Sequence, residues 1–490
     1  MAKNIVICSD GTGNTATKGR GTNVFKLYEA IALHDHWGNP SKPRQYSIYD
    51  DGVGTESFKP LKILGGAFGW GLARNVRQLY TELCRVYEPG DNIYIFGFSR
   101  GAFTARTLAG LICNTGVIKA EGLDRGELDR RVKLAYRVCR YRYKSCLSRI
   151  VRKPELPEGS VHEESDKIKI VGVWDTVDAV GFPVPYISDL LNYVFRFKFP
   201  NMDLDDKVEH GFHALSVDDA RKTFHPLLWN DRKGVSQVWF AGVHTNVGGG
   251  YPKQGVSLVT LDWMMRKAAR LGLRFVKHDE KVFRAHKNVY DKVYDSRSGV
   301  SFFYRYAPRN IHKLAAGAKI STPDIHISVF DRTLQGVEGY SPCNIPADCN
   351  IVALDNQGQT ARFSDAEALV RSKVGGEGCD SLLDHNWLKW VVQIRSGAHY
   401  LFMALGIAFV LYLVAFGNLP QDVCPALNWS CLKSIFGVVA NDSIAAWLLG
   451  TSLLALAFEL IGRSIMRRLV SSFWVKASPD LEMALRKGPD

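Results

Sequence analysis

The sequence lacks the close cysteine spacings on which small disulfide frameworks and zinc sites depend. Its 490 residues include ten cysteines, and no two of them form a CxxC pair. A disulfide-stapled fold and a structural zinc centre are therefore not expected.

The N-terminus lacks the long apolar stretch and small-residue cleavage site of a secretory signal peptide. Only four residues precede the short strand-like run Ile5–Cys8. We therefore expect the N-terminal part to stay in the compartment in which it is made.

Internal repeats and low-complexity segments are also absent. Hydrophobic residues make up 46% and charged residues 23% of the chain, which excludes a largely disordered chain, a collagen and a heptad rod. Lysine and arginine total 62 against 49 aspartate and glutamate residues, so the formal net charge is +13.

Two long apolar runs are present near the C-terminus. Between Arg395 and Asp422 lie 26 residues without a formal charge, and a second run covers Ser443 to Phe458. A membrane-spanning helix needs about 20 apolar residues. We therefore predict spans at residues 398–417 and 443–462, with Glu459 paired or near the membrane surface. The alternative is a buried helical hairpin in a soluble core.

Basic residues flank these predicted spans unevenly. Two closely precede the first span and six follow the second, whereas the loop between them carries only Lys433. Positive flanks stay on the cytoplasmic side, so we expect both termini and the large N-terminal domain to be cytoplasmic. Cys424 and Cys431 would then lie on the far side, either as a disulfide or as free thiols.

Short β-branched or aromatic runs alternate with helical patterns in the N-terminal part. The runs cover residues 4–8, 44–49, 92–96, 168–174 and 235–243. This alternation predicts an α/β fold with a mostly parallel sheet and helices on both faces. We expect this domain to cover residues 1–385, a two-helix membrane hairpin 386–465, and a basic tail 466–490.

The most informative motif is a glycine-flanked serine. Gly97-Phe98-Ser99-Arg100-Gly101 follows a predicted strand and precedes a helix-like segment. This context is typical of a nucleophile elbow, in which a sharp turn lifts the serine hydroxyl clear of the sheet. Glycine is needed there because backbone and helix approach too closely for a Cβ atom. We predict Ser99 as a nucleophile; a structural turn serine is the alternative.

A serine nucleophile needs a base and a carboxylate that orients the base. Asp175 and His244 each directly follow a predicted strand, so both would emerge at the carboxyl edge of the sheet, where ligands bind. The order Ser, Asp, His is that of α/β-hydrolases. The alternative acid is Asp178, and the alternative bases are His213, His225 and His326.

The first predicted strand ends in a second glycine-rich turn, Ser9-Asp10-Gly11-Thr12-Gly13-Asn14. The turn lacks the P-loop lysine and complete GxGxxG spacing, which disfavours nucleotide binding. We interpret the backbone amides of Gly11 or Thr12, with that of Arg100, as an oxyanion hole. A plain turn capped by Asp10 is an equal alternative.

The segment from Arg130 to Lys153 has ten basic and no acidic residues, interleaved with apolar side chains. Such a segment suits an anionic membrane surface. The alternatives are a solvated helix face and a nucleic-acid surface, but no base-reading motif supports nucleic acid. The candidate lipid contacts are Arg130, Arg131, Lys133, Arg137 and Arg140.

Seven segments carry a resemblance to a known family. They are SDGTGN (9–14), YDDGVGT (49–55), GFSRGAFTAR (97–106), VWDTVDAVG (173–181), WFAGVHTNVGGGY (239–251), IHISVFDR (325–332) and GYSPCNIP (339–346). Together they resemble the α/β-hydrolase family that includes the class one phospholipase effectors of type VI secretion. The resemblance implies a Ser–Asp–His esterase with phospholipids among its substrates, in which Ser99, Asp175 and His244 fill these roles.

One position departs from the family pattern. The family commonly has HSD where this chain has His244-Thr245-Asn246. Whether a carboxylate there supports a metal or the catalytic residues therefore stays open for this chain. The membrane hairpin lies outside the common domain.

These observations predict a serine esterase or lipase of α/β-hydrolase type, anchored in a membrane that we expect to be a bacterial inner membrane. Its substrates would be lipids, with phospholipids foremost, and it would need no organic cofactor or metal ion. The alternatives are a thioester or peptide hydrolase and a non-enzymatic membrane scaffold or sensor. An intact serine, aspartate and histidine set argues against the scaffold.

Overall fold

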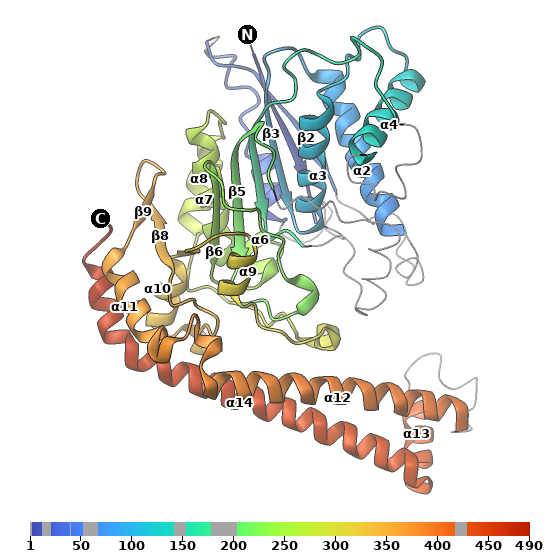
Figure 1. The fold of residues 1–490 in the computed structure, drawn as a ribbon, viewed down its shortest axis with the longest axis vertical. Helices are drawn as coiled ribbons and strands as arrows, with labels where there is room; N and C mark the ends of the chain where they lie inside the picture. Colours follow the sequence, from blue (N-terminus) through green and yellow to red (C-terminus); the bar gives the residue numbers. More distant parts are fainter. Residues whose placement is uncertain are drawn as a thin grey trace.

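A computed structural model of the chain describes residues 2–11, 21–39, 41–51, 67–141, 153–177, 203–416 and 429–490 (Figure 1). Thr12, Asp178 and Cys424 lie outside the described residues, as do the side chain of Cys431 and most of the basic segment beyond Tyr141.

The centre of the fold is a nine-stranded sheet with the order β2-β1-β3-β4-β5-β6-β7-β8-β9. All neighbouring strands pair in parallel except β8 and β9, which are antiparallel. The predicted mostly parallel sheet is therefore confirmed. The strands are β1 (Asn4–Ser9), β2 (Gln45–Asp50), β3 (Asn92–Phe98), β4 (Ile168–Trp174), β5 (Val208–Ser216), β6 (Val235–Phe240), β7 (Asp324–His326), β8 (Asn350–Leu354) and β9 (Thr360–Arg362).

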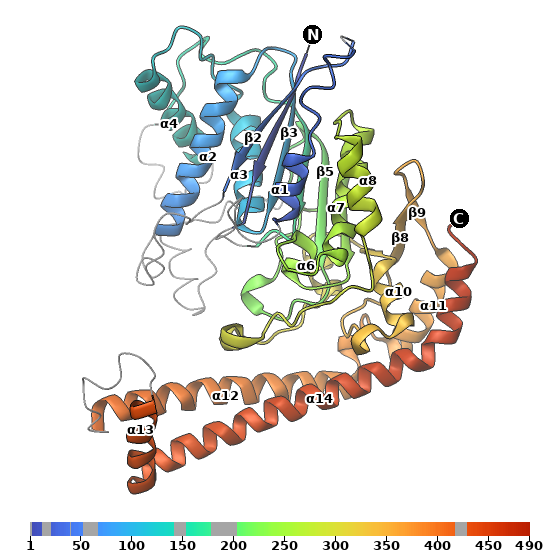
Figure 2. The same ribbon diagram turned by 180° about the vertical axis from the view of Figure 1, so that it is seen from behind.

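Helices cover both faces of this sheet, so its central strands are buried on both sides. In β1, Ile5 and Ile7 join one hydrophobic cluster, while Val6 and Cys8 join another on the opposite face, as the two-residue period of a strand requires. Figures 1 and 2 show the two helical layers. One layer has α2 (Ala67–Val86), α3 (Arg100–Thr115) and α4 (Arg125–Tyr141); the other has α1 (Asn23–Glu29), α7 (Gly255–Arg270) and α8 (Lys277–His286).

A third hydrophobic cluster lies at the β7–β9 end of the sheet. It joins β7 and β8 to α9 (Ile311–Gly317), α10 (Ser328–Gln335) and α11 (Ser364–Val374). Val470, Trp474, Ala477 and Leu481, from the C-terminal helix, are buried in the same cluster. The end of the chain is therefore packed against the α/β domain.

A helical hairpin projects from the α/β domain, as both views show (Figures 1 and 2). It consists of α12 (Asn386–Phe416), the short α13 (Trp429–Asn441) and α14 (Ser443–Arg486). By length and composition α12 and α14 can each cross a membrane, with mean hydropathies of 2.1 and 2.0 in their most apolar windows. α14 continues through residue 466 without a break, so the predicted tail is part of this helix.

Glu459 is the acidic residue at the end of the second apolar run, and it is paired. Its Oε1 atom accepts hydrogen bonds from Arg395 of α12 at 3.1 Å and from Arg297 of the α/β domain at 3.0 Å. All three side chains are less than 10% exposed. This cluster fixes the base of the hairpin to the domain.

Candidate active site

Ser99 sits on a sharp turn between β3 and α3. Its φ of 58° and ψ of −120° lie outside the regions that ordinary side chains prefer. A Cβ atom at Gly97 would lie 2.5 Å from the carbonyl oxygen of Gly101, and one at Gly101 would lie 2.2 Å from that of Ser9. Both flanking glycines are therefore required by close backbone approach, as expected from the motif.

The structure brings Ser99, His244 and Asp175 into one hydrogen-bonded chain. Nε2 of His244 lies 2.8 Å from the Ser99 hydroxyl, and Nδ1 lies 2.6 Å from Oδ2 of Asp175. Because an ionised carboxylate only accepts, Nδ1 donates to Asp175 and Nε2 is left to accept from the serine. All three residues are buried, with exposed fractions of 8%, 4% and 0%. In serine hydrolases, a histidine held in this way between a carboxylate and a serine activates the hydroxyl for attack on a carbonyl carbon.

Asp175 is held by a buried arginine that the sequence reasoning missed. Arg309 donates to both carboxylate oxygens, at 2.7 and 2.8 Å, and both side chains are fully buried. Burial by itself raises the pKa of Asp175, but the charge and hydrogen bonds of Arg309, with the bond to His244, outweigh it and hold that pKa far below its usual value. The carboxylate therefore stays ionised. Ser216 adds a backbone N–H bond at 3.0 Å.

The alternative histidines have other partners. His213 accepts from the Thr176 amide, the ring of His225 bonds to the Ala307 carbonyl, and His326 accepts from the Ser328 amide. Burial lowers the pKa values of His213 and His326 to about 3 and that of His225 to about 4. Each is a neutral residue that satisfies local backbone groups.

Two of the residues predicted for the oxyanion hole, Arg100 and Gly11, differ in where their backbone amides lie and what these amides bind. Arg100 is the first residue of α3, so its amide lies at the positive end of a helix directly after Ser99. The Gly11 amide donates to Oδ1 of Asp10 at 2.6 Å, while Oδ2 accepts from Thr22 and Tyr49. In this arrangement Arg100 is the better-placed donor.

His244 is positioned by the turn that precedes it. β6 ends at Phe240 rather than continuing to Val243, because Gly242 adopts a φ of 108° and its amide donates to Asp218 at 2.6 Å. The His244 amide donates to Asp219 at 3.3 Å. Asn246, at the position of the family aspartate, accepts from the Val243 and Tyr294 amides and donates to the Lys292 carbonyl. An ionised aspartate could not make that last bond.

The sequence also matches a known protein family. Residues 3–267 match the model described as T6SS, phospholipase effector Tle1-like, catalytic domain. The match spans more than half of the 490 residues and includes Ser99, Asp175 and His244. The chain belongs to this family.

Two individual proteins are also similar to this Tle1-like chain. Over 255 residues it is 31% identical to the uncharacterized protein YEL023C from Saccharomyces cerevisiae; the match covers 48% of this chain and 34% of the yeast protein. The chain thus spans about a third of that relative's length. A crystal structure of an uncharacterized protein from Pseudomonas aeruginosa aligns with a TM-score of 0.37 and 16% identity, covering 94% of this chain and 66% of the other.

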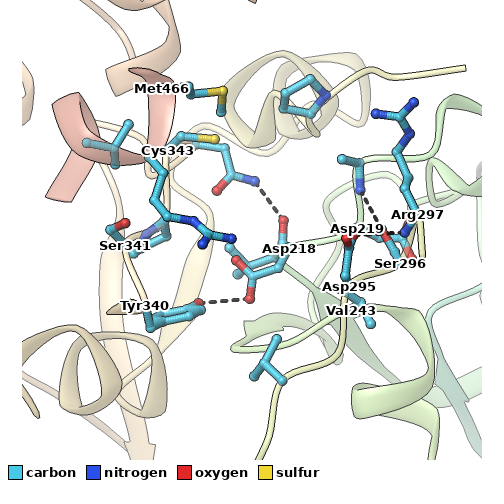
Figure 3. A pocket seen from close by; sticks show the side chains of 18 of the residues that line it. Asp218, Asp219, Val243, Asp295, Ser296, Arg297, Tyr340, Ser341, Cys343 and Met466 are labelled. Carbon is cyan, nitrogen blue, oxygen red and sulfur yellow. Dashed lines mark hydrogen bonds between the residues drawn. The ribbon is translucent and has the colours of Figure 1, made fainter. Parts of the chain in front are cut away.

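A cavity of about 290 Å³ in this Tle1-like protein lies between the α/β domain and α14, beside the active-site loops. Figure 3 shows Asp218 and Tyr340 joined by a hydrogen bond, with Met466 of α14 nearby. Burial raises the pKa of Asp218 to about 6 despite the bond from Gly242. Neither Ser99 nor His244 is among the residues that line this cavity, so the cavity is separate from the Ser99 hydroxyl.

The five predicted lipid-contact residues lie on α4, and their charges are partly compensated. Arg130 and Arg131 pair with Glu127, and Lys133 pairs with Asp129. Arg137 and Arg140 are exposed in the last turns of the helix. Glu127 and Asp129 lie within one helical turn before Arg130. A charge count that starts at Arg130 leaves them out and therefore overstates the net positive charge of α4.

Among the described residues, no group of three or more His, Cys, Asp or Glu side chains is arranged to hold a metal ion.

Proposed function

We propose that the protein is a membrane-anchored serine hydrolase that cleaves carboxylic ester bonds of phospholipids. The observation that carries this proposal is the buried chain of Ser99, His244 and Asp175, with bonds of 2.8 and 2.6 Å, at a strained turn of a Tle1-like domain.

In the proposed reaction the Ser99 oxygen attacks the ester carbonyl while Nε2 of His244 takes the hydroxyl proton. Asp175 stabilises the resulting imidazolium, and the Arg100 amide at the N-terminus of α3 donates to the oxyanion. His244 returns the proton to the leaving alcohol, which leaves an acyl group on Ser99. A water molecule, deprotonated by His244, then releases the fatty acid and restores the serine.

The function is tested with phospholipid vesicles and the full chain in detergent. We expect release of free fatty acid and lysophospholipid from the vesicles. A protein that cleaves only thioesters or peptides would contradict the proposed substrate, and a folded protein without any acyl hydrolase activity would favour a scaffold.

Arg309 is proposed as a positioning residue, because it contacts Asp175 rather than substrate. Arg309→Lys keeps the charge but loses the two-pronged contact, so we expect kcat/KM for a soluble ester to fall by about 10- to 100-fold. Without the lowering effect of Arg309, burial raises the pKa of Asp175. In Arg309→Met the acid limb of the pH–rate profile should therefore move to higher pH.

Arg309→Met also leaves the buried Asp175 carboxylate without its cationic partner, which costs about 3–5 kcal/mol of stability, so the pH profile is measured on the fraction shown to be folded by circular dichroism. The matched control is Lys313→Met, which removes an exposed positive charge from α9. An unshifted acid limb in folded Arg309→Met would contradict the positioning role.

Membrane anchoring is proposed from α12 and α14, in whose most apolar windows only 11% and 22% of the residues are buried. In this proposal residues 1–385 form the catalytic domain, 386–465 the membrane hairpin, and 466–490 a basic cytoplasmic tail packed on the catalytic domain. Both termini are cytoplasmic, because the basic flanks resist translocation.

Cysteine labelling tests this topology. In a chain with Cys424 and Cys431 changed to serine, a membrane-impermeant thiol reagent applied to intact cells should label Asn441→Cys, at the end of α13, and should not label Asp490→Cys. The reverse pattern would contradict the orientation, and labelling of both or of neither would contradict a two-span hairpin. Lysed cells, in which both variants should react, provide the control.

A further inference from the structure

A short aromatic segment, Gly299–Tyr304, lies between the active site and the first apolar helix. It contains a single turn of 3₁₀ helix, η4 (Gly299–Phe303). The ring of Phe302 packs edge-on against His399 and Phe402 of α12, at centroid distances of 5.3 and 5.7 Å. Phe303 is 56% exposed. The 3₁₀ turn therefore contacts α12 at His399, where the predicted first span begins, and the next ring in the turn, that of Phe303, is exposed.

The other end of the same segment reaches the active site. Tyr304 packs edge-on against Phe224 at 5.5 Å, and Phe224 packs edge-on against the imidazole of His244 at 5.1 Å. Phe224 belongs to the short turn η3 (Lys222–Phe224), and the guanidinium of Arg221 lies 3.4 Å from its ring centre. Ring contacts therefore join one end of the segment to Phe402 of α12 and, through Phe224, the other end to the catalytic base.

The segment is fixed to the hairpin by charged contacts just before it. Arg297 bonds to Glu459 of α14 at 3.0 Å and to His399 of α12 at 3.0 Å, and its guanidinium stacks 5.0 Å from the Phe302 ring. Asp295 pairs with Arg463 at 2.7 Å. Two ion pairs, Arg297–Glu459 and Asp295–Arg463, therefore fix the position of this segment along the axis of the hairpin.

We propose that Gly299–Tyr304 is a bilayer-facing lip along which the acyl chain of a membrane phospholipid reaches Ser99. Aromatic side chains favour the membrane–water interface, and an acyl chain that leaves the bilayer needs a continuous apolar surface to avoid water. Phe303 enters the interface, and Phe302, Tyr304 and Phe224 supply the surface that leads to His244. This inference rests on the proposed function, since it names how that substrate arrives.

The position of Phe303 is tested without hydrolysis. An environment-sensitive fluorophore is attached to Phe303→Cys in the full-length Ser99→Ala chain, reconstituted in vesicles whose phospholipids carry spin labels on the upper acyl chain. The parent chain, treated identically, corrects for native cysteines. The control is Trp37→Cys, since Trp37 is 73% exposed and lies in the loop before β2, at the opposite edge of the sheet from Ser99. We expect the spin labels to quench the fluorophore at position 303 and not the one at position 37. An unquenched fluorophore at position 303 would contradict the proposal that Gly299–Tyr304 faces the bilayer, even if the protein is a phospholipase.

The contribution of the lip to catalysis is tested with a ratio of two rates. The full-length Phe303→Ser and Trp37→Ser proteins are compared on phospholipid vesicles and on a short water-soluble ester. We expect the ratio of vesicle to soluble activity to fall about tenfold for Phe303→Ser, since one large apolar contact with lipid is lost, and to stay unchanged for Trp37→Ser. An unchanged ratio for Phe303→Ser would overturn the proposal. Quenching at position 303 in a protein that cleaves only soluble esters would instead place the error in the proposed substrate.

Discussion

The Ser99→Ala protein should be folded and inactive, with kcat for a soluble ester lower by about 10⁴-fold or more. The reason lies in the single oxygen that is removed: it donates to His244, which Asp175 orients, and it is the atom proposed to attack the ester. Because Ser99 is buried at 8% exposure and caps no helix with its side chain, its removal should leave the unfolding temperature close to that of the unchanged protein.

Steady-state kinetics on purified full-length protein, with a thermal melt of the same sample, measure this effect. Ser372→Ala, on the exposed side of α11, is the matched control and should retain full activity. Turnover by Ser99→Ala within tenfold of the unchanged protein would rule out the serine mechanism.

His244→Ala should be nearly as defective as Ser99→Ala, because the three residues act as a unit and the serine loses its base. Asp175→Asn should also lose most activity, since an amide at this position can present its NH₂ group to Nδ1 and favour the wrong tautomer. We expect a reduction of about 10⁴-fold for His244→Ala and a smaller one for Asp175→Asn.

His326→Asn separates a specific effect from the general cost of altering a buried histidine. His326 is also buried and accepts from the Ser328 amide through Nδ1, a bond that the asparagine oxygen can replace. This variant should keep activity within a few-fold. If His326→Asn, or an equivalent change at His213 or His225, abolished activity while His244→Ala did not, His244 would not be the base.

The three proposed catalytic residues could be predicted from the sequence because their signals are local. Ser99 follows an apolar run and is flanked by glycines, and Asp175 and His244 also follow predicted strands. Parallel strands bring such residues to one edge of the sheet whatever the intervening chain does. The sequence pattern predicts a strand to residue 243, but β6 ends at Phe240. The turn at Gly242 involves a hydrogen bond to Asp218, which the local sequence does not reveal.

Arg309 could not be predicted in this way. It lies 134 residues from Asp175 in sequence, in a segment without a recognised motif, and only tertiary packing buries its guanidinium. The sequence analysis predicts none of β5, β7, β8 and β9. Strands β7 and β9, with three residues each, are too short to show a period, whereas β5 and β8 are longer.

The sequence does contain a pattern that predicts the packing of the end of α14. Val470, Trp474, Ala477 and Leu481 are spaced by four, three and four residues, which is the pattern of a helix with one apolar face. The basic residues around this pattern instead predict a charged tail. In the structure the apolar residues of the pattern share one hydrophobic cluster with Phe330 and Val370, so the segment is helical and packed on the α/β domain.

Whether Ser99 is the acyl-accepting nucleophile of a phospholipase is determined by locating the residue that becomes phosphonylated. The full-length protein is treated with a fluorophosphonate, digested and analysed by mass spectrometry, with and without an excess of phospholipid vesicles. We expect one modified residue, Ser99, and slower modification when vesicles compete. Modification of another residue, or vesicle hydrolysis that persists when no serine can be labelled, would contradict this role of Ser99.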